Sequence, residues 1–185
     1  MSANPSVPLR VVVDTREQRP FAFNHAQYAA EVTTGTLRTG DYSLAGLEHC
    51  VAVERKSLDD LIGCLTVGRD RFERELDRAR SLECFAVVIE ATLDDVARHR
   101  YTSRMSPHSA LQSILAFQVR YGVPFVWAGS RGGGEYVTYW TLEKFRRERE
   151  EAKREDAAVS ELEAIGKRLA RKGREKREGR RAAHA

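Results

Sequence analysis

Hydrophobic positions along the chain follow two patterns, short continuous apolar runs and longer stretches with helical spacing. Residues 9–13, apolar except for Arg10, and residues 85–89 are runs rich in β-branched or apolar side chains with the length of a buried strand. The stretch that begins at Leu58 repeats apolar side chains at i+3, i+4 and i+7, which is typical of a helix with one buried face. Strands that alternate with helices form layered folds, so the pattern predicts an α/β protein with a mixed sheet covered on both faces.

The other elements follow from the same periodicities and from capping and turn residues. We predict a loop over residues 21–30, a flexible loop over 130–134, and a helix from residue 135 to 155, although residues 135–140 also have strand propensity. Strands are predicted at residues 9–13, 31–37 (an edge strand), 42–47, 50–54, 85–89 and 124–128, and helices after the N-cap Ser57, at 70–82 and at 107–121.

Charge is distributed unevenly along the 185 residues, whose net charge is +4. Residues 1–145 contain 17 basic and 18 acidic side chains, whereas residues 146–185 contain 14 and 9. We therefore predict a domain over 1–145 and a charged tail over 146–185, helical at first and disordered and basic from Arg171. Such a tail either contacts nucleic acid or only improves solubility.

Several classes of protein do not fit this sequence. No apolar run has the roughly 18 residues of a membrane span, and residues 1–8 lack the features of a secretory signal. The three cysteines lack the spacing of a disulfide framework or a zinc site. The glycine run at 132–134 lacks a phosphate-loop lysine, so no nucleotide cofactor is expected. We predict a cytoplasmic, nucleoid-associated protein.

Candidate chemistry begins at the end of the strand at 50–54. Side chains alternate along a strand, so Glu54 and Lys56 share one face with Ala52. A carboxylate and an ammonium group there can hold a divalent metal and stabilise developing negative charge. The alternative is a surface salt bridge at a strand end.

Two further carboxylates lie at predicted strand ends. Asp41 directly follows Gly40, and Asp14 ends the first strand, with Arg16 and Glu17 behind it. Carboxylate oxygens suit Mg²⁺ or Mn²⁺, which usually take one or two protein carboxylates and keep water or phosphate oxygens in the remaining positions. The spacing alone does not establish that the three carboxylates converge.

Three motifs occur in order: D-T-R-E-Q-R-P-F at residues 14–21, T-G-D-Y-S-L at 39–44 and V-E-R-K-S-L-D-D-L at 53–61. In this order and spacing they resemble the nuclease domain of XPF-type structure-specific endonucleases, a branch of the PD-(D/E)XK nuclease superfamily. The similarity extends over residues 9–145. It implies a restriction-endonuclease-like fold, a mixed central sheet flanked by helices, followed here by the C-terminal helical basic tail.

The resemblance also implies a function, a Mg²⁺- or Mn²⁺-dependent endonuclease that hydrolyses DNA, at branched or flap structures, in repair, recombination or replication. Asp14, Asp41 and Glu54 correspond to metal-binding carboxylates, with the Arg55 carbonyl as a further ligand. Lys56 corresponds to the residue that orients water and stabilises the transition state. The remaining family positions are Arg16, Glu17 and Arg55, implied in phosphate contacts and site geometry, and Asp60, which equally fits a helix cap.

The family's G-R-x-x-x-Q element is less regular here. Gly68 and Arg69 fit its start, but the helical register favours Arg71, with Glu75 at the glutamine position. Arg69 and Arg71 are therefore candidate DNA contacts, or members of a solvated helix face. Family members commonly act as dimers through this domain, so a homodimer is expected. The alternatives to an active nuclease are a noncatalytic DNA-binding scaffold and an accessory subunit of a nuclease heterodimer.

Overall fold

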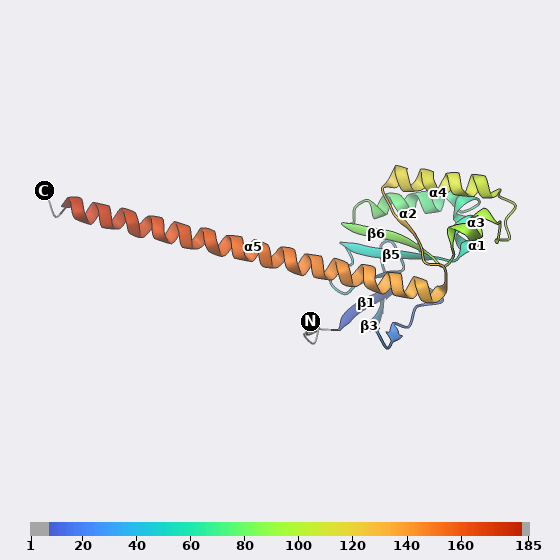
Figure 1. Cartoon of the computed structure of the whole chain (residues 1–185), viewed down its shortest axis with the longest axis horizontal. Helices are drawn as coiled ribbons and strands as arrows, with labels where there is room; N and C mark the ends of the chain where they lie inside the picture. Colours follow the sequence, from blue (N-terminus) through green and yellow to red (C-terminus); the bar gives the residue numbers. More distant parts are fainter. Residues whose placement is uncertain (1–7, 183–185) are drawn as a thin grey trace. The chain divides into compact units, whose positions relative to one another are not determined.

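Seven strands form one mixed sheet in the computed structural model, which describes residues 8–182 (Figure 1). Their order across the sheet is β2-β3-β1-β4-β5-β6-β7. β4 runs antiparallel to both of its neighbours, whereas β1 and β3 are parallel, as are β5, β6 and β7. The strands are β1 (Leu9–Asp14), β2 (Asn24–His25), β3 (Tyr28–Gly35), β4 (Tyr42–Leu44), β5 (Val51–Lys56), β6 (Cys84–Ile89) and β7 (Phe125–Trp127). The predicted α/β fold with a mixed sheet is confirmed.

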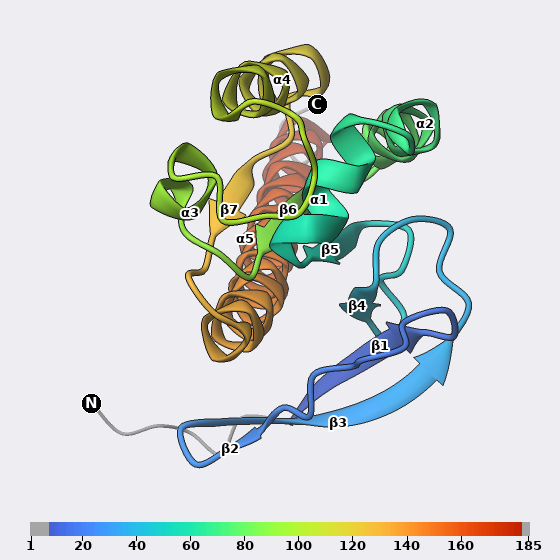
Figure 2. The same ribbon diagram turned by 90° about the vertical axis from the view of Figure 1, so that its right-hand side faces the viewer.

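Four helices gather on one side of this sheet (Figure 2). Ser57 caps α1 by accepting the backbone N–H of Asp60, and Ser106 caps α4, with Pro107 as its first residue. Their apolar faces bury Leu61, Phe72 and Phe117 against one face of the sheet. The four helices are α1 (Leu58–Leu65), α2 (Arg69–Ala79), α3 (Leu93–Ala97) and α4 (Pro107–Tyr121). The short α3 is an element that the sequence analysis did not predict.

The opposite face of the sheet is covered by the start of α5 (Arg131–Ala182) and by the segment between β1 and β2. Leu142 of α5 packs with Phe21 and Phe23 on apolar side chains of β1, β4 and β5. Tyr42 lies among these rings, 5.0 Å from Phe21 and 5.6 Å from Phe23 between ring centroids. Its hydroxyl accepts the backbone N–H of Phe21, so the segment after β1 is attached to the sheet.

Residues 130–134 do not form the flexible loop that we predicted, because α5 begins at Arg131. The Ser130 hydroxyl accepts the backbone N–H of Gly133, as an N-cap side chain does. A Cβ atom at Gly133 would lie 2.0 Å from the Ala128 carbonyl oxygen. The glycine run therefore allows the helix to start in close contact with the end of β7, an effect that the sequence did not reveal.

The chain divides into two compact units, residues 1–145 and 146–185. In the second unit α5 continues to Ala182, so the prediction of disorder from Arg171 is wrong. Lysine, arginine and glutamate are good helix formers, and their propensity outweighs the charge repulsion that suggested disorder. Within the described residues, no helix is both long and apolar enough to cross a membrane.

Gly40 joins the loop after β3 to Asp41 at the start of β4. Its φ of +81° lies in the left-handed region, and a Cβ atom there would lie 2.8 Å from the Cβ of Ala52. Both restrictions favour glycine. Gly46, in the turn between β4 and β5, shares the conformation, with a φ of +83°, but has open space around its Cα.

We predict that Gly40→Ala destabilises the fold more than Gly46→Ala. Each substitution places a side chain in the left-handed region, at a cost of about 1–2 kcal/mol. Gly40→Ala adds overpacking against β5, worth about 1–3 kcal/mol more. Urea denaturation measures the difference, and equal midpoints for the two variants would contradict the close packing of Gly40.

Candidate active site

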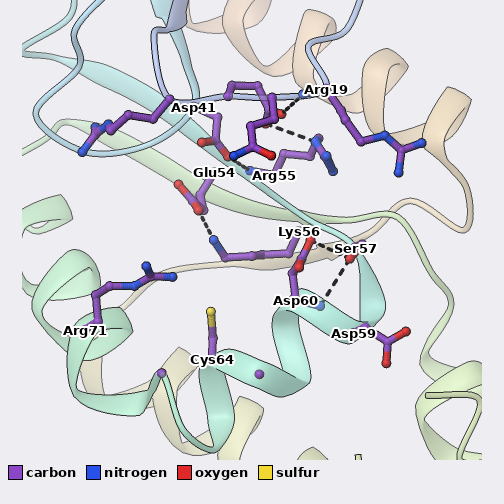
Figure 3. Close-up of a pocket in the computed structure, with 15 residues that line it drawn as sticks. Arg19, Asp41, Glu54, Arg55, Lys56, Ser57, Asp59, Asp60, Cys64 and Arg71 are labelled. Atoms are coloured by element: carbon purple, nitrogen blue, oxygen red, sulfur yellow. Dashed lines mark hydrogen bonds and ion pairs between the residues drawn. The ribbon is translucent and has the colours of Figure 1, made fainter. Parts of the chain in front are cut away.

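The end of β5 places two charged side chains on the face of the sheet that α1 and α2 cover. Glu54 is only 3% exposed, and its carboxylate forms an ion pair with the Lys56 ammonium group (Figure 3). Ala52 packs on the same helical side, whereas Val51 and Val53 pack in the opposite core. The predicted alternation is therefore confirmed, and the pair is not a solvated surface salt bridge.

Asp41 is held beside this pair by the backbone of β5. Its N–H donates to the Val53 carbonyl at 2.9 Å, and its Oδ2 accepts the N–H of Arg55 at 2.8 Å. Burial raises the pKa of Asp41 to about 6, and the charges of Glu17 and Glu75 act in the same direction. The site therefore holds a carboxylate that is destabilised by its surroundings.

Two further carboxylates, Asp41 and Glu75, act on the buried Glu54. Burial raises the pKa of Glu54 well above its usual value, and the charges of Asp41 and Glu75 add to this, although Lys56 opposes it. Burial alone would lower the pKa of Lys56, but Glu54 and Glu75 raise it, so the ammonium group stays protonated. Three carboxyl groups thus surround one cation.

Glu75 of α2 is the functional candidate that the sequence analysis did not select. Its carboxylate lies close enough to Glu54 to help raise the pKa of that residue, through its charge and through interaction with the Glu54 side chain. The backbone carbonyl of Glu75 also accepts the Thr39 hydroxyl at 3.4 Å. The sequence offered one signal for it: Glu75 stands one helical turn after Arg71, at the glutamine position of the G-R-x-x-x-Q element.

Asp14, the third predicted metal ligand, has a different environment. Its Oδ1 accepts Nε of Arg16 at 2.6 Å, and its Oδ2 accepts the backbone N–H of Leu37 at 2.6 Å. Arg16 also donates to the Leu37 carbonyl at 2.9 Å. Asp14 and Arg16 therefore join the end of β1 to the loop that leads to Asp41, and Asp14 does not line the pocket that holds Asp41 and Glu54.

Glu17 and Arg55 belong to a second, buried charge network. Nε of Arg55 lies 3.3 Å from Glu17 Oε2, and its Nη1 lies 3.4 Å from Glu90 Oε2. The Glu17 and Arg55 side chains are each 7% exposed. Both residues line the pocket, but the guanidinium group of Arg55 is held by two carboxylates.

The predicted basic contacts fall into two groups. Arg16 and Arg71 line the pocket. Arg69 does not, because its Nε bonds Glu73 at 3.0 Å and its guanidinium lies 4.6 Å from the centroid of the Phe117 ring. Asp60 also lines the pocket, and its side chain accepts the Ser57 hydroxyl at 2.6 Å at the start of α1.

These groups surround an open pocket of about 830 Å³ (Figure 3). Asp41, Glu54 and Lys56 lie between Arg71 at one end of the pocket and Arg19 at the other. Its lining consists of Arg16, Glu17, Gln18, Arg19, Asp41, Glu54, Arg55, Lys56, Ser57, Asp59, Asp60, Gly63, Cys64, Gly68 and Arg71.

The donor set can be compared with the needs of a divalent cation. Among the residues described, no group of three His, Cys, Asp or Glu side chains is arranged to hold a metal. Asp41 and Glu54 form a pair of buried, mutually repelling carboxylates, and Mg²⁺ commonly takes only one or two. The pair therefore fits Mg²⁺ or Mn²⁺ that keeps water and phosphate oxygens in its other positions.

A family model described as ERCC4 domain matches residues 13–132, which include every residue that lines the pocket. The chain belongs to the ERCC4 domain family. XPF from Aeropyrum pernix shares its fold, with 24% identity and a TM-score of 0.60 over 78% of this chain and 69% of that one. The same protein in complex with DNA matches with 24% identity and a TM-score of 0.57, over 76% of this chain and 66% of that one. No curated protein matches the sequence.

We predict that Asp41→Asn stabilises the metal-free ERCC4 domain at high pH. A carboxyl group whose pKa is raised on folding favours the folded state below its unfolded pKa and loses that contribution as the pH rises through about 6. The free energy of unfolding of the variant should therefore equal that of the parent near pH 4 and exceed it by about 2–3 kcal/mol at pH 8.

Urea denaturation in EDTA across this pH range measures the effect. Asp77→Asn, which removes an exposed carboxylate on α2, is the control and should show no such pH-dependent gain. A constant difference between parent and Asp41→Asn from pH 4 to pH 8 would contradict the burial of charge at Asp41.

Proposed function

We propose that this chain is a metal-dependent DNA endonuclease that hydrolyses phosphodiester bonds, at branched or flap DNA. The observation that carries the proposal is the convergence of Asp41, Glu54 and Lys56 in one pocket whose wall bears arginines. Membership of the ERCC4 domain family and the DNA complex of the Aeropyrum pernix protein support it. Involvement in repair, recombination or replication is part of the same proposal.

The residues have distinct chemical roles in this proposal. Asp41 and Glu54 would hold Mg²⁺ or Mn²⁺, with the Arg55 carbonyl as a further donor, and the metal would supply a Lewis acid for the scissile phosphate. Lys56, kept protonated by Glu54 and Glu75, donates hydrogen bonds to the attacking water and to the phosphate oxygens. Water attacks phosphorus, and the bond to the leaving oxygen breaks without a covalent enzyme intermediate.

Asp14 and Arg16 act in this proposal by fixing the loop that carries Asp41. Asp14 Oδ1 accepts a hydrogen bond from Arg16, Asp14 Oδ2 accepts one from the Leu37 N–H, and Arg16 donates to the Leu37 carbonyl, so both oxygens of Asp14 already have partners within the protein. A direct metal contact of Asp14 remains a prediction from the family resemblance. Arg71 and Arg16, at the pocket wall, would contact phosphates on either side of the scissile bond.

Cleavage assays test the proposal directly. We expect Glu54→Gln, Asp41→Asn and Lys56→Met to lose at least about a hundredfold in cleavage rate, because each removes a group from the reacting site. Asp77→Asn, on the exposed side of α2, should cut within about twofold of the parent.

The substrates are labelled flap, fork, Holliday-junction, duplex and single-stranded DNA, each with Mg²⁺, Mn²⁺ or EDTA. Parental cleavage by Glu54→Gln would contradict the assignment. DNA binding by the parent without cleavage of any substrate would support the noncatalytic scaffold or a missing partner subunit. Sedimentation of the same preparation tests the expected homodimer.

We propose that the basic part of the tail adds nonspecific phosphate contacts. Residues 167–182 contain nine Lys or Arg side chains and two Glu, and they are helical. Binding that depends on phosphate neutralisation weakens with salt, with a logarithmic slope of about 0.9 per contact on duplex DNA. The alternative is that this helix only improves solubility.

Replacement of Lys167, Arg168, Arg171 and Lys172 by glutamine tests this role, because glutamine keeps helix propensity and removes charge. We expect the slope of duplex DNA affinity against salt to become less steep, by up to about 3–4 if every side chain contacts a phosphate. An unchanged slope would identify the tail as a solubilising extension.

A further inference from the structure

Arg131, the first residue of α5, contacts the segment that follows β1. Its Nη2 donates to the backbone carbonyls of Arg19 at 2.7 Å and of Pro20 at 2.9 Å. Its guanidinium group also lies 5.0 Å from the centroid of the Phe21 ring. One arginine therefore holds three consecutive residues of this segment.

These contacts belong to a closed ring of charged and polar groups. Nη1 of Arg131 donates to Glu90 Oε1 at 3.2 Å, and Glu90 Oε2 is paired with Arg55. Arg55 is paired with Glu17, whose Oε1 accepts the backbone N–H of Arg19 at 2.6 Å. The ring therefore connects the start of α5, the end of β6, the catalytic strand β5 and the segment after β1.

Arg19 is the member of the ring whose side chain is exposed. Its N–H is fixed by Glu17 and its carbonyl by Arg131, so its backbone is held on both sides. The side chain lines the pocket, and Figure 3 shows it at the opposite end from Arg71. Within the described part of the chain, no carboxylate pairs with the Arg19 guanidinium group.

We propose that Arg19 contacts a DNA phosphate and that Arg131 is the positioning residue that holds Arg19 for this contact. The proposal rests on the proposed DNA endonuclease function. An exposed, unpaired guanidinium group at the end of a pocket can donate strong, charge-assisted hydrogen bonds to phosphate oxygens. Fixing its backbone before binding reduces the conformational freedom lost when the contact forms.

The choice of substitution at Arg131 separates position from charge. Lysine keeps the positive charge, but it lacks the planar fork that serves two carbonyls and Glu90 together. Arg131→Lys therefore leaves the net charge unchanged while it releases Arg19. If Arg131 contributed only its charge, DNA affinity would be unchanged in Arg131→Lys.

The experiment measures the affinity of the full chain for fork and duplex DNA against salt, in a Glu54→Gln background that binds without cutting. We expect Arg19→Gln to weaken binding about tenfold and to reduce the salt slope by about 0.9. Arg131→Lys should weaken binding in the same direction and also reduce the slope, although it removes no charge. Arg80→Gln, an exposed arginine paired with Asp77 on α2, is the control and should change neither quantity.

The decisive comparison uses the double variant that combines Arg19→Gln with Arg131→Lys. If Arg131 acts through Arg19, Arg131→Lys should weaken binding little further once Arg19→Gln is present. If the losses of DNA affinity in the two single variants add up in the double variant, the positioning role of Arg131 is wrong. If Arg19→Gln binds DNA as tightly as the Arg80→Gln control, the phosphate contact of Arg19 is wrong. If Arg131→Lys does not fold, Arg131→Gln replaces it in the double-variant comparison alone, because glutamine also removes a charge and therefore changes the salt slope by itself.

The failure of this inference differs from failure of the proposed function. A parent chain that neither binds nor cuts DNA contradicts the endonuclease itself. A parent that binds and cuts, with unchanged affinity and slope in Arg19→Gln, contradicts only the role of Arg19 and Arg131.

Discussion

The burial of like charges at the end of β5 is the constraint on which this structure depends. Asp41 and Glu54 lie close to each other and to the partly buried Glu75. Their charge is offset by Lys56, by the backbone N–H of Arg55 and by the charge of Arg16. Such an arrangement costs folding free energy unless a cation is added. The surrounding fold therefore has to hold these groups together, and the hydrogen bonds between Asp41 and the backbone of β5 contribute to this.

The central strands and the Glu54–Lys56 pair were predictable because their causes are local, whereas the predicted loop over residues 21–30 is wrong in part, since it contains β2 and the start of β3, and β3 lies between β2 and β1, not at an edge. Alternation along residues 51–56 places Glu54 and Lys56 on one face whatever the rest of the fold does. The caps at Ser57 and Ser106 define helix starts through short side-chain contacts. The close packing of Gly40 on Ala52, in contrast, was not apparent from the sequence, because it depends on the pairing of β4 with β5.

Contacts between distant segments were not predictable. Nothing in the sequence around Asp14 shows that Arg16 and Leu37 occupy its carboxylate, since Leu37 lies 23 residues further on. The pairing of Arg55 with Glu90 and the attachment of Arg131 to the segment after β1 likewise depend on strand order. Periodicity describes one element at a time, whereas these interactions join several.

The most direct test of the central claim is the thermal stability of the parent and of Asp41→Asn, measured with increasing Mn²⁺ at pH 8. A cation that binds only the folded state raises the melting temperature with its concentration. We expect the melting temperature of the parent to rise with Mn²⁺ and that of Asp41→Asn to stay unchanged. An equal rise for both proteins, or none for the parent, would contradict a divalent cation site at the buried carboxylates.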